Sequence, residues 1–557
     1  MSARRLLLCA AVLHVAAAVA LFVAGRAQLA PGFIDRDGII ARLADDSLDY
    51  QQAGIPLTHA LRRGDISALT EPRAPLHVRA IALSWLLLSP LFGYSTLAAE
   101  PFNLLCYLAV VGLVYAIGRE AMQAGRAWIP AAVVAVWPSF LFHTLQLLKD
   151  ALFIAGTLTL ILIVLTWLTR SYRWAHAALA TVLLLLASGA VIVVRGQAAI
   201  VVSALLALGL AFLLVRQVRE KRSLLPNVVC AIVAFVLVSG AVFARARVHE
   251  TTKHLSAREV GEPKETSAVR LPTAVVRTAA RAGVAGWLDR TALHAGSIRN
   301  RYAFMDPAGG SGVDHHVPMR SARDVIGYLP RALTVGLWAP FPPMWIGSGH
   351  TVGRGGRMVS GTETLVITGF QLIGVAAILL PGRRVAQLFL LAVATLGVAS
   401  LAIVVTNIGS LYRFRYSFWM LFIVLGVAGA SKLRAPGWRP ALAALALIFT
   451  ACGTAVEPRT GDVHVLNFTG FTVQGVYLAP QSVRTWQENI LSSHVLRDGD
   501  STVVHLANGT SAVRWDVRVD GEHGYRAEWK SLDLSSASTV ILRIENGVVI
   551  ADVESRS

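Results

Sequence analysis

The chain has 557 residues, of which 55% are hydrophobic and 15% charged. A water-soluble enzyme of this length is excluded, because soluble proteins carry about 25% charged residues. The four cysteines lie far apart in the sequence, which excludes a disulfide framework and a Cys-x-x-Cys metal site. The net charge is +18. In a membrane protein, lysines and arginines first indicate which loops are cytoplasmic, and they also bind lipid phosphates.

Membrane-spanning helices are predicted by runs of about 17 to 25 apolar residues, which cross a hydrocarbon core of about 30 Å. On this basis we predict eleven spans, near 6–24, 98–117, 127–146, 151–169, 176–194, 198–215, 225–243, 363–380, 386–405, 417–431 and 440–455. We interpret the first as an anchor, because no clear cleavage site follows it before Pro31. Ile81–Phe92 is too short to span and is predicted to lie at the outer interface.

The basic residues predict a cytoplasmic N-terminus. With that orientation, the short cytoplasmic turns contain many arginines and lysines, opposed by Glu120 and Glu220 alone. The long polar segments 25–97, 244–362 and 456–557 then lie on the outer face. The segment 244–362 carries 16 basic and 8 acidic residues, which would suit an anionic lipid. A nucleic-acid partner is not expected.

The hydrophobicity pattern of the sequence changes after about residue 456. Short stretches such as "SAVRWDVRV" alternate apolar and polar residues, with turn signals such as "RDGD" and "ENG" between them. We therefore predict an all-α polytopic membrane domain over 1–455, with loop helices on the outer face, and a small all-β domain over 456–557. The last apolar run resembles a lipoprotein signal ending at Cys452, although the simpler interpretation is a final span.

Carboxylates at the outer face are the candidates for chemistry. An ionised carboxylate close to a membrane span costs free energy unless water or a charged partner compensates it. Five aspartates of the first outer loop lie close to the first span: Asp35, Asp37, Asp45, Asp46 and Asp49. A second acid, Asp150, stands beside Lys149 and near His143 at the next outer turn. The alternatives are a hydrated loop for the first group and a helix N-terminus for Asp150.

Four stretches carry a family resemblance: "DDSLDYQQAG", "EPRAP", "LFGYSTLAAEPFNLLCYLAVVGLVYAIGRE" and "WPSFLFHTLQLLKDALF". With the predicted topology, they resemble the GT-C class of integral membrane glycosyltransferases, which includes protein O-mannosyltransferases and aminoarabinose transferases. The resemblance covers roughly residues 1–215. It implies a bacterial inner-membrane enzyme that moves a sugar from a polyprenyl-phosphate carrier to a lipid, glycan or protein acceptor.

The resemblance implies that Asp46 and Asp150 are the catalytic acids, and Tyr50, four residues after Asp46, is expected to bind substrate. A carboxylate can take the acceptor proton. The chain lacks the tandem Asp-Glu pair of the mannosyltransferases, which disfavours mannose as the donor sugar.

The leaving phosphate needs positive charge, and guanidinium groups fork onto phosphate oxygens. The outer-face cations that would supply this charge are Lys149, Arg73, Arg195, Arg413 and Arg415. For each arginine the alternative is interfacial snorkelling.

Other functions have less sequence support. A divalent cation is possible at the acids, and "DHHVP" offers Asp314, His315 and His316, although adjacent histidines point apart and further ligands would be needed.

No phosphate-binding loop or serine-hydrolase motif is present. The alternatives are an O-antigen-type ligase or polymerase and a transporter or lipid flippase. A transporter would place ionisable residues inside its spans, often with repeat symmetry.

Overall fold

A computed structural model describes most of the chain. It covers 1–241 except 41–43, 45, 71–73, 123, 197 and 221–223, and 284–431 except 305–311, 315, 316, 318, 320, 347–352 and 380–383. In the C-terminal part it covers 462–555 except 470, 471, 481–485, 487, 488, 492–494, 498, 499, 506–513, 522–525, 533, 535, 536, 546 and 547. The described chain is mostly helical and ends in two small β-sheets, which agrees with the predicted fold class of helices followed by a small β region.

The first half of the chain supplies most of the bundle. Its helices are α1 (Ala3–Arg26), α2 (Asp46–Arg62), η1 (Ile66–Thr70), α3 (Leu76–Phe92), α4 (Glu100–Ala121), η2 (Ala124–Arg126), α5 (Trp128–Ala135), α6 (Pro138–Thr144), α7 (Asp150–Thr169), α8 (Trp174–Val194) and α9 (Ala198–Glu220), and the shorter apolar helix Leu225–Ala241. The later helices are α11 (Val284–Phe304), α12 (Ala322–Trp338), α13 (Pro342–Ile346), α14 (Gly353–Leu379), α15 (Arg384–Val404), α16 (Ile408–Phe414) and α17 (Tyr416–Ala430).

Seven described helices are long and apolar enough to cross a membrane, and the bent pair α16–α17 would make eight. The predicted count of eleven is therefore not confirmed. The predicted span 440–455 lies outside the described residues, and Leu225–Ala241 falls below the length required. Ile81–Phe92 forms part of α3, a 17-residue helix that is likewise too short to span.

The predicted span 127–146 is not continuous. It consists of α5 with eight residues and α6 with seven, and Trp137 between them is extended, with φ −67° and ψ 115°. Pro138 explains the break, because proline lacks an N–H and disfavours the helical conformation in the residue before it. The break turns Trp137 and Ser139 towards α14.

The later helices pack closely with the earlier ones. Helix α17 contacts α14, α15, α4, α5 and α7, and nearly every α17 side chain is buried. Glycines allow its close approach to α14: a Cβ on Gly374 would lie 2.9 Å from the Leu425 Cβ, and one on Gly426 would lie 2.8 Å from the Phe370 Cα. Helices α16 and α17 meet at an angle of 57°, which sets α16 across the end of the bundle.

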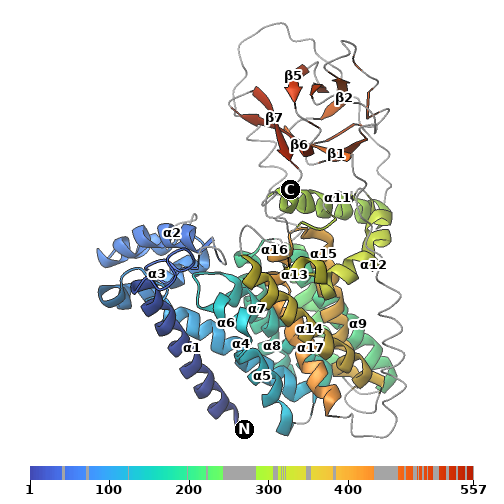
Figure 1. Cartoon of the computed structure of the whole chain (residues 1–557). Coiled ribbons are helices and arrows are strands. Elements are labelled where there is room, and N and C mark those ends of the chain that lie inside the picture. The colour runs from blue at the N-terminus through green and yellow to red at the C-terminus, as the bar shows by residue number, and fades with distance from the viewer. Residues whose placement is uncertain are drawn as a thin grey trace.

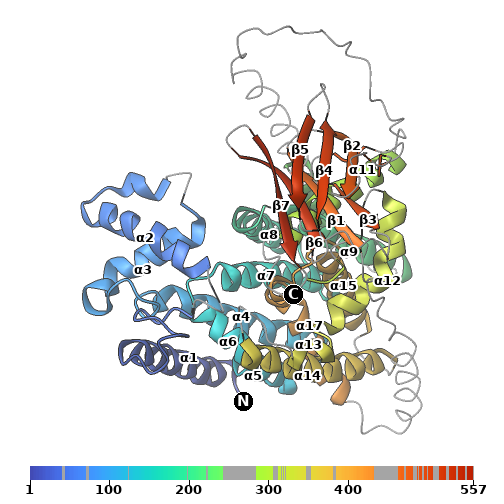
Figure 2. The same ribbon diagram turned by 45° about the horizontal axis from the view of Figure 1, so that its top comes forward.

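Helices α2 and α3 pack on each other to one side of this bundle, as both views show (Figures 1 and 2). In Figure 1, α2 and α16 lie near the end of the helical bundle that is away from the N-terminus. The N-terminus of α7 is joined to α6 by a short turn, and α8 returns antiparallel to α7, so its C-terminus reaches the same end. This arrangement gathers chain ends that are far apart in sequence.

Seven strands lie among the described residues of the C-terminal region, which agrees with the all-β prediction. They are β1 (Asp462–Phe468), β2 (Val473–Pro480), β3 (Ser501–His505), β4 (Trp515–Gly521), β5 (Arg526–Leu532), β6 (Ala537–Glu545) and β7 (Val548–Ser555). One sheet has the order β3-β1-β6-β7 and the other β2-β4-β5; among these described strands, β1 and β6 pair in parallel and the other pairs are antiparallel. Alternate side chains of the strands form an apolar core of the C-terminal region itself, which includes Val465, Val476, Val517 and Leu542.

Candidate functional site

Four charged side chains meet where the ends of four helices converge. Asp46 begins α2, Asp150 begins α7, Arg195 follows the last residue of α8, and Arg413 lies in α16. The structure thus brings together two predicted acids and two predicted arginines. Asp46 and Arg413 are separated by 367 positions in sequence.

Asp150 is the buried member of the group. Its side chain is 6% exposed, and it accepts a hydrogen bond from the Arg195 guanidinium in a direct ion pair. The Arg413 Nε lies 3.9 Å from its second carboxylate oxygen. Two guanidinium groups therefore neutralise a carboxylate that would be costly to bury alone.

Arg195 is held by aromatic rings as well as by charge. Its guanidinium lies 3.9 Å from the centroid of the Phe414 ring and 5.1 Å from that of Phe153. Cation–π contacts of this kind are stronger in desolvated surroundings. This packing, with the ion pair to Asp150, gives Arg195 a fixed position, unlike a side chain that snorkels towards a lipid surface.

Asp46 is in a different environment. Its side chain is 43% exposed, and the Arg413 Nη2 donates to its Oδ2 at 3.3 Å. Arg413 therefore bridges the two acids, one buried and one accessible. The accessible carboxylate is the one that a substrate can reach.

Three further side chains surround the ion pairs. The Lys149 ammonium lies 5.7 Å from the centroid of the Tyr50 ring. The His77 ring packs edge-on against the same Tyr50 ring, with 4.3 Å between the ring centroids. Burial first, and then the charges of Asp46 and Asp150, raise the pKa of Tyr50 to about 12. Tyr50 therefore remains a neutral hydroxyl near neutral pH.

The two basic groups next to Tyr50 are both shifted towards their neutral forms. Burial, followed by the charge of Lys149, lowers the pKa of His77 to about 3. Burial, followed by the charge of Arg195, lowers the pKa of Lys149. His77 is 1% exposed and its Nε2 has no hydrogen-bond partner among the described residues. His77 was not among the predicted site residues; the sequence signal for it is its place four residues before the buried Ile81 in a helical pattern.

Polar contacts within the first loop hold α2 against the bundle. The Ile40 N–H donates to Gln146 Oε1 at 2.9 Å, just before Lys149 and Asp150 in the chain. Gln51 Nε2 donates to Asp37 at 3.0 Å and to the Tyr94 carbonyl at 2.8 Å. These bonds join the loop, α2 and the turn before α7, and so they set the position of Asp46 relative to Asp150.

Two predicted arginines are not part of this cluster as described. Arg415 is 0% exposed, and it donates to the carbonyls of Gly336 and Ala339. Its guanidinium stacks 3.9 Å from the Trp419 ring centroid. These contacts are internal ones that tie α16–α17 to the end of α12. Arg73 lies outside the described residues, as does Asp45.

A buried carboxylate lies behind the cluster. Glu363 in α14 is 5% exposed and accepts hydrogen bonds from Trp137, Ser139 and Tyr412. Residue 363 is the first position of the predicted span 363–380, but α14 begins ten residues earlier, at Gly353. The available signal was an acidic residue adjoining a long apolar run.

A metal site receives no support from the described side chains. Within the described ranges, no group of three or more His, Cys, Asp or Glu residues could hold a metal ion. The predicted His315 and His316 lie outside them. Asp314 accepts hydrogen bonds from Arg331 Nε at 2.8 Å and from the Tyr328 hydroxyl at 3.0 Å. Despite its burial, the hydrogen bond and charge of Arg331 lower the pKa of Asp314.

The chain has a likeness in structure to a known protein. No protein-family model matches the chain, and no curated protein matches it. A crystal structure of ArnT from Cupriavidus metallidurans, bound to undecaprenyl phosphate, is similar over 79% of this chain and 63% of that chain, with 15% identity and a TM-score of 0.35. This chain therefore matches less than two thirds of the length of that protein.

The cluster has the composition of an anion-binding site with a base. Three cations, Lys149, Arg195 and Arg413, surround two carboxylates, so the group carries a net positive charge when all are ionised. Guanidinium groups suit phosphate oxygens. An accessible carboxylate next to them can accept a proton.

Proposed function

We propose that the protein is a GT-C-type membrane glycosyltransferase that uses a polyprenyl-phosphate sugar. The observation that carries the proposal is that one arginine contacts two carboxylates of different exposure. Arg413 contacts both Asp46, whose side chain is accessible, and Asp150, whose side chain is buried. This arrangement places a base directly next to fixed positive charge. Glycosyl transfer from a phosphate carrier needs both groups at one place.

The environments of the two acids suggest separate roles. Asp150 is occupied by Arg195 and buried, so it serves as the anchor that orders the cations. Asp46 is exposed, so it takes the proton of the acceptor hydroxyl. As that hydroxyl oxygen forms a bond to the anomeric carbon, the bond from that carbon to the phosphate oxygen breaks, and the phosphate leaves with the electron pair.

The cations bind the leaving phosphate in this proposal. Arg195 and Arg413 stabilise the charge that develops on its oxygens, and Lys149 adds to the field. Tyr50 remains protonated and can donate a hydrogen bond to the sugar or to the phosphate. Arg415 has no substrate role here, because its side chain is buried and its two terminal nitrogens donate to backbone carbonyls.

The orientation is part of the proposal. We place the N-terminus in the cytoplasm and the charged cluster at the outer face of a bacterial inner membrane, following the positive-inside pattern. The β domain then lies outside the membrane as an accessory module. The acceptor is a hydroxyl of a lipid, glycan or protein.

The test is transfer by Asp46→Asn, with Asp49→Asn as the matched control. Asp49 lies in the same first turn of α2 and is exposed. Loss of a general base costs about 10²- to 10⁴-fold in rate. We expect that loss for Asp46→Asn, with binding of undecaprenyl phosphate retained, and near-normal transfer for Asp49→Asn. Equal losses in the two variants, or near-normal transfer by Asp46→Asn, would contradict the role of Asp46.

A further inference from the structure

Glu363 is a buried carboxylate that the proposed transfer step does not use. It lies in α14, within a candidate span, and is 5% exposed. An ionisable group at such a place is expensive unless it is compensated, and it is a functional candidate by default. The described contacts show what compensates it.

Four hydrogen bonds converge on this one carboxylate. Oε1 accepts from the Ser139 backbone N–H at 2.9 Å, and Oε2 accepts from Trp137 Nε1 at 2.8 Å. Oε2 also accepts from the hydroxyls of Ser139 and Tyr412. Glu363 therefore joins the break between α5 and α6 to α16.

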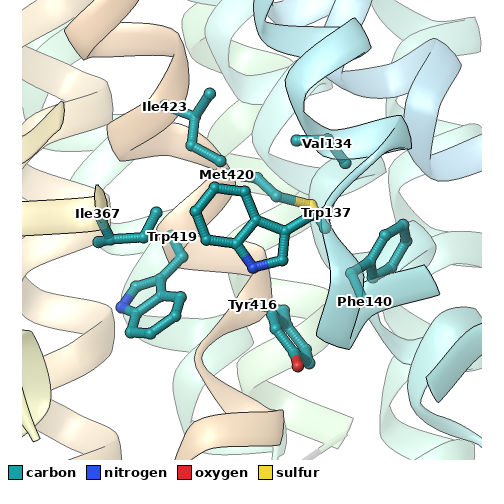
Figure 3. Close-up of a pocket in the computed structure, with 8 residues that line it drawn as sticks. All are labelled: Val134, Trp137, Phe140, Ile367, Tyr416, Trp419, Met420 and Ile423. Atoms are coloured by element: carbon teal, nitrogen blue, oxygen red, sulfur yellow. The ribbon is translucent and has the colours of Figure 1, made fainter. Parts of the chain in front are cut away.

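The surroundings of Glu363 make these bonds strong. A small apolar cavity beside the network is lined in part by Trp137, Tyr416 and Trp419, and Figure 3 shows these rings around it. Ile367, one turn along α14 from Glu363, lines the same cavity. In such a low-dielectric setting a satisfied hydrogen bond is stronger than in water, and an unsatisfied group is costly.

The link to the charged cluster is Tyr412. It precedes Arg413 in α16, and adjacent helical residues point about 100° apart, so one can face α14 while the other faces α2 and α7. The Tyr412 hydroxyl binds Glu363, and Arg413 contacts Asp46 and Asp150. Fixing Tyr412 therefore fixes the rotation of α16 and the direction of Arg413.

Building on the proposed function, we infer that Glu363 is a positioning residue that sets Arg413 against the two catalytic-site acids by holding Tyr412. Glu363 touches no substrate in this account and acts through α16. In Glu363→Gln, an amide NH₂ group replaces one carboxylate oxygen and faces groups that are themselves hydrogen-bond donors. The Tyr412 hydroxyl therefore loses its carboxylate acceptor. Arg413 then loses its fixed direction.

The experiment measures binding of undecaprenyl phosphate to the full-length protein in nanodiscs. A hydrogen bond to a charged group contributes about 1.5 to 3 kcal/mol, which corresponds to about tenfold to hundredfold in affinity. We expect Glu363→Gln to weaken binding by that factor, and Tyr412→Phe to weaken it in the same direction. In an Arg413→Gln background, Glu363→Gln should weaken it no further, because coupled residues are not additive.

The matched control is Glu120→Gln. Glu120 is a buried carboxylate of α4 that is paired with Arg170 and accepts from the Thr169 hydroxyl. Its loss should lower stability without changing affinity for the phosphate lipid. If Glu363→Gln binds like wild type, or if its effect adds to that of Arg413→Gln, the inference is overturned.

A second measurement does not depend on the proposed function. Mass spectrometry can follow modification of Arg413 by phenylglyoxal in the protein without ligand. We expect modification to be faster in Glu363→Gln than in wild type or Glu120→Gln, and an unchanged rate would overturn the inference. A wild-type protein that binds no undecaprenyl phosphate would instead contradict the proposed function, and the modification rate would still decide the role of Glu363.

Discussion

The two acids should differ sharply in what they contribute to stability. Asp150 is 6% exposed and lies 3.9 Å from Arg413 in addition to its ion pair with Arg195. At an effective dielectric constant of about 20, charges at that separation interact by about 4 kcal/mol, and breaking a buried pair costs about 3 to 5 kcal/mol. Asp46 is 43% exposed, and exposed pairs contribute about 0.2 to 1 kcal/mol.

Asp150→Asn should therefore lower the free energy of unfolding by about 3 to 5 kcal/mol, and Asp46→Asn by about 1 kcal/mol or less. Unfolding of purified protein in mixed micelles, followed by tryptophan fluorescence, measures both. The double variant Asp150→Asn/Arg195→Met should recover much of the loss, because no unpaired charge stays buried. Glu220→Gln, which breaks the i,i+4 pair with Arg216, is the control and should cost about 0.3 to 0.5 kcal/mol. Equal costs for the two aspartates would refute this reasoning.

Three further predictions concern pH, the β domain and topology. Because burial and Arg195 lower the pKa of Lys149, its ammonium loses its proton at a lower pH than an ordinary lysine; affinity for undecaprenyl phosphate should fall as pH rises through that pKa, and an equally steep fall in Lys149→Met would show another group to be responsible. Deletion of the residues after Thr460 should reduce turnover or alter acceptor choice while phosphate-lipid binding persists, because the β domain has its own core; loss of that binding in a stably folded deletion would contradict this. Reporter fusions at Ser223 and Arg384 should report a cytoplasmic location, and those at Pro263 and Ser557 a periplasmic one. A cytoplasmic location of Ser557 would contradict the predicted topology.

Hydrophobic runs alone predicted much of the helical framework. The runs near 98–117, 151–169 and 176–194 correspond closely to α4, α7 and α8. Length and composition carry this information, because a spanning helix must be apolar over its whole length. The run at 127–146 misled because hydropathy does not register the backbone effect of Pro138.

The convergence of the charged groups could be only partly predicted. Asp46 and Asp150 were recognisable as acids next to spans, but nothing local in the sequence indicates that Arg413 reaches both of them. The roles of Arg195 and Arg415 also depend on tertiary packing: one faces Asp150, and the other binds carbonyls at the end of α12. Glu363 was missed because its partners come from a helix break and from α16, which lie far from it in sequence.

The most direct test of the proposed function is an experimental structure of the full-length protein with a polyprenyl-phosphate analogue bound. The account predicts that the phosphate oxygens lie within hydrogen-bond distance of the Arg195 and Arg413 guanidinium groups, with the Asp46 carboxylate facing the position of the anomeric carbon. A phosphate bound away from these two arginines, or at the end of the bundle where Glu120 pairs with Arg170, would contradict it.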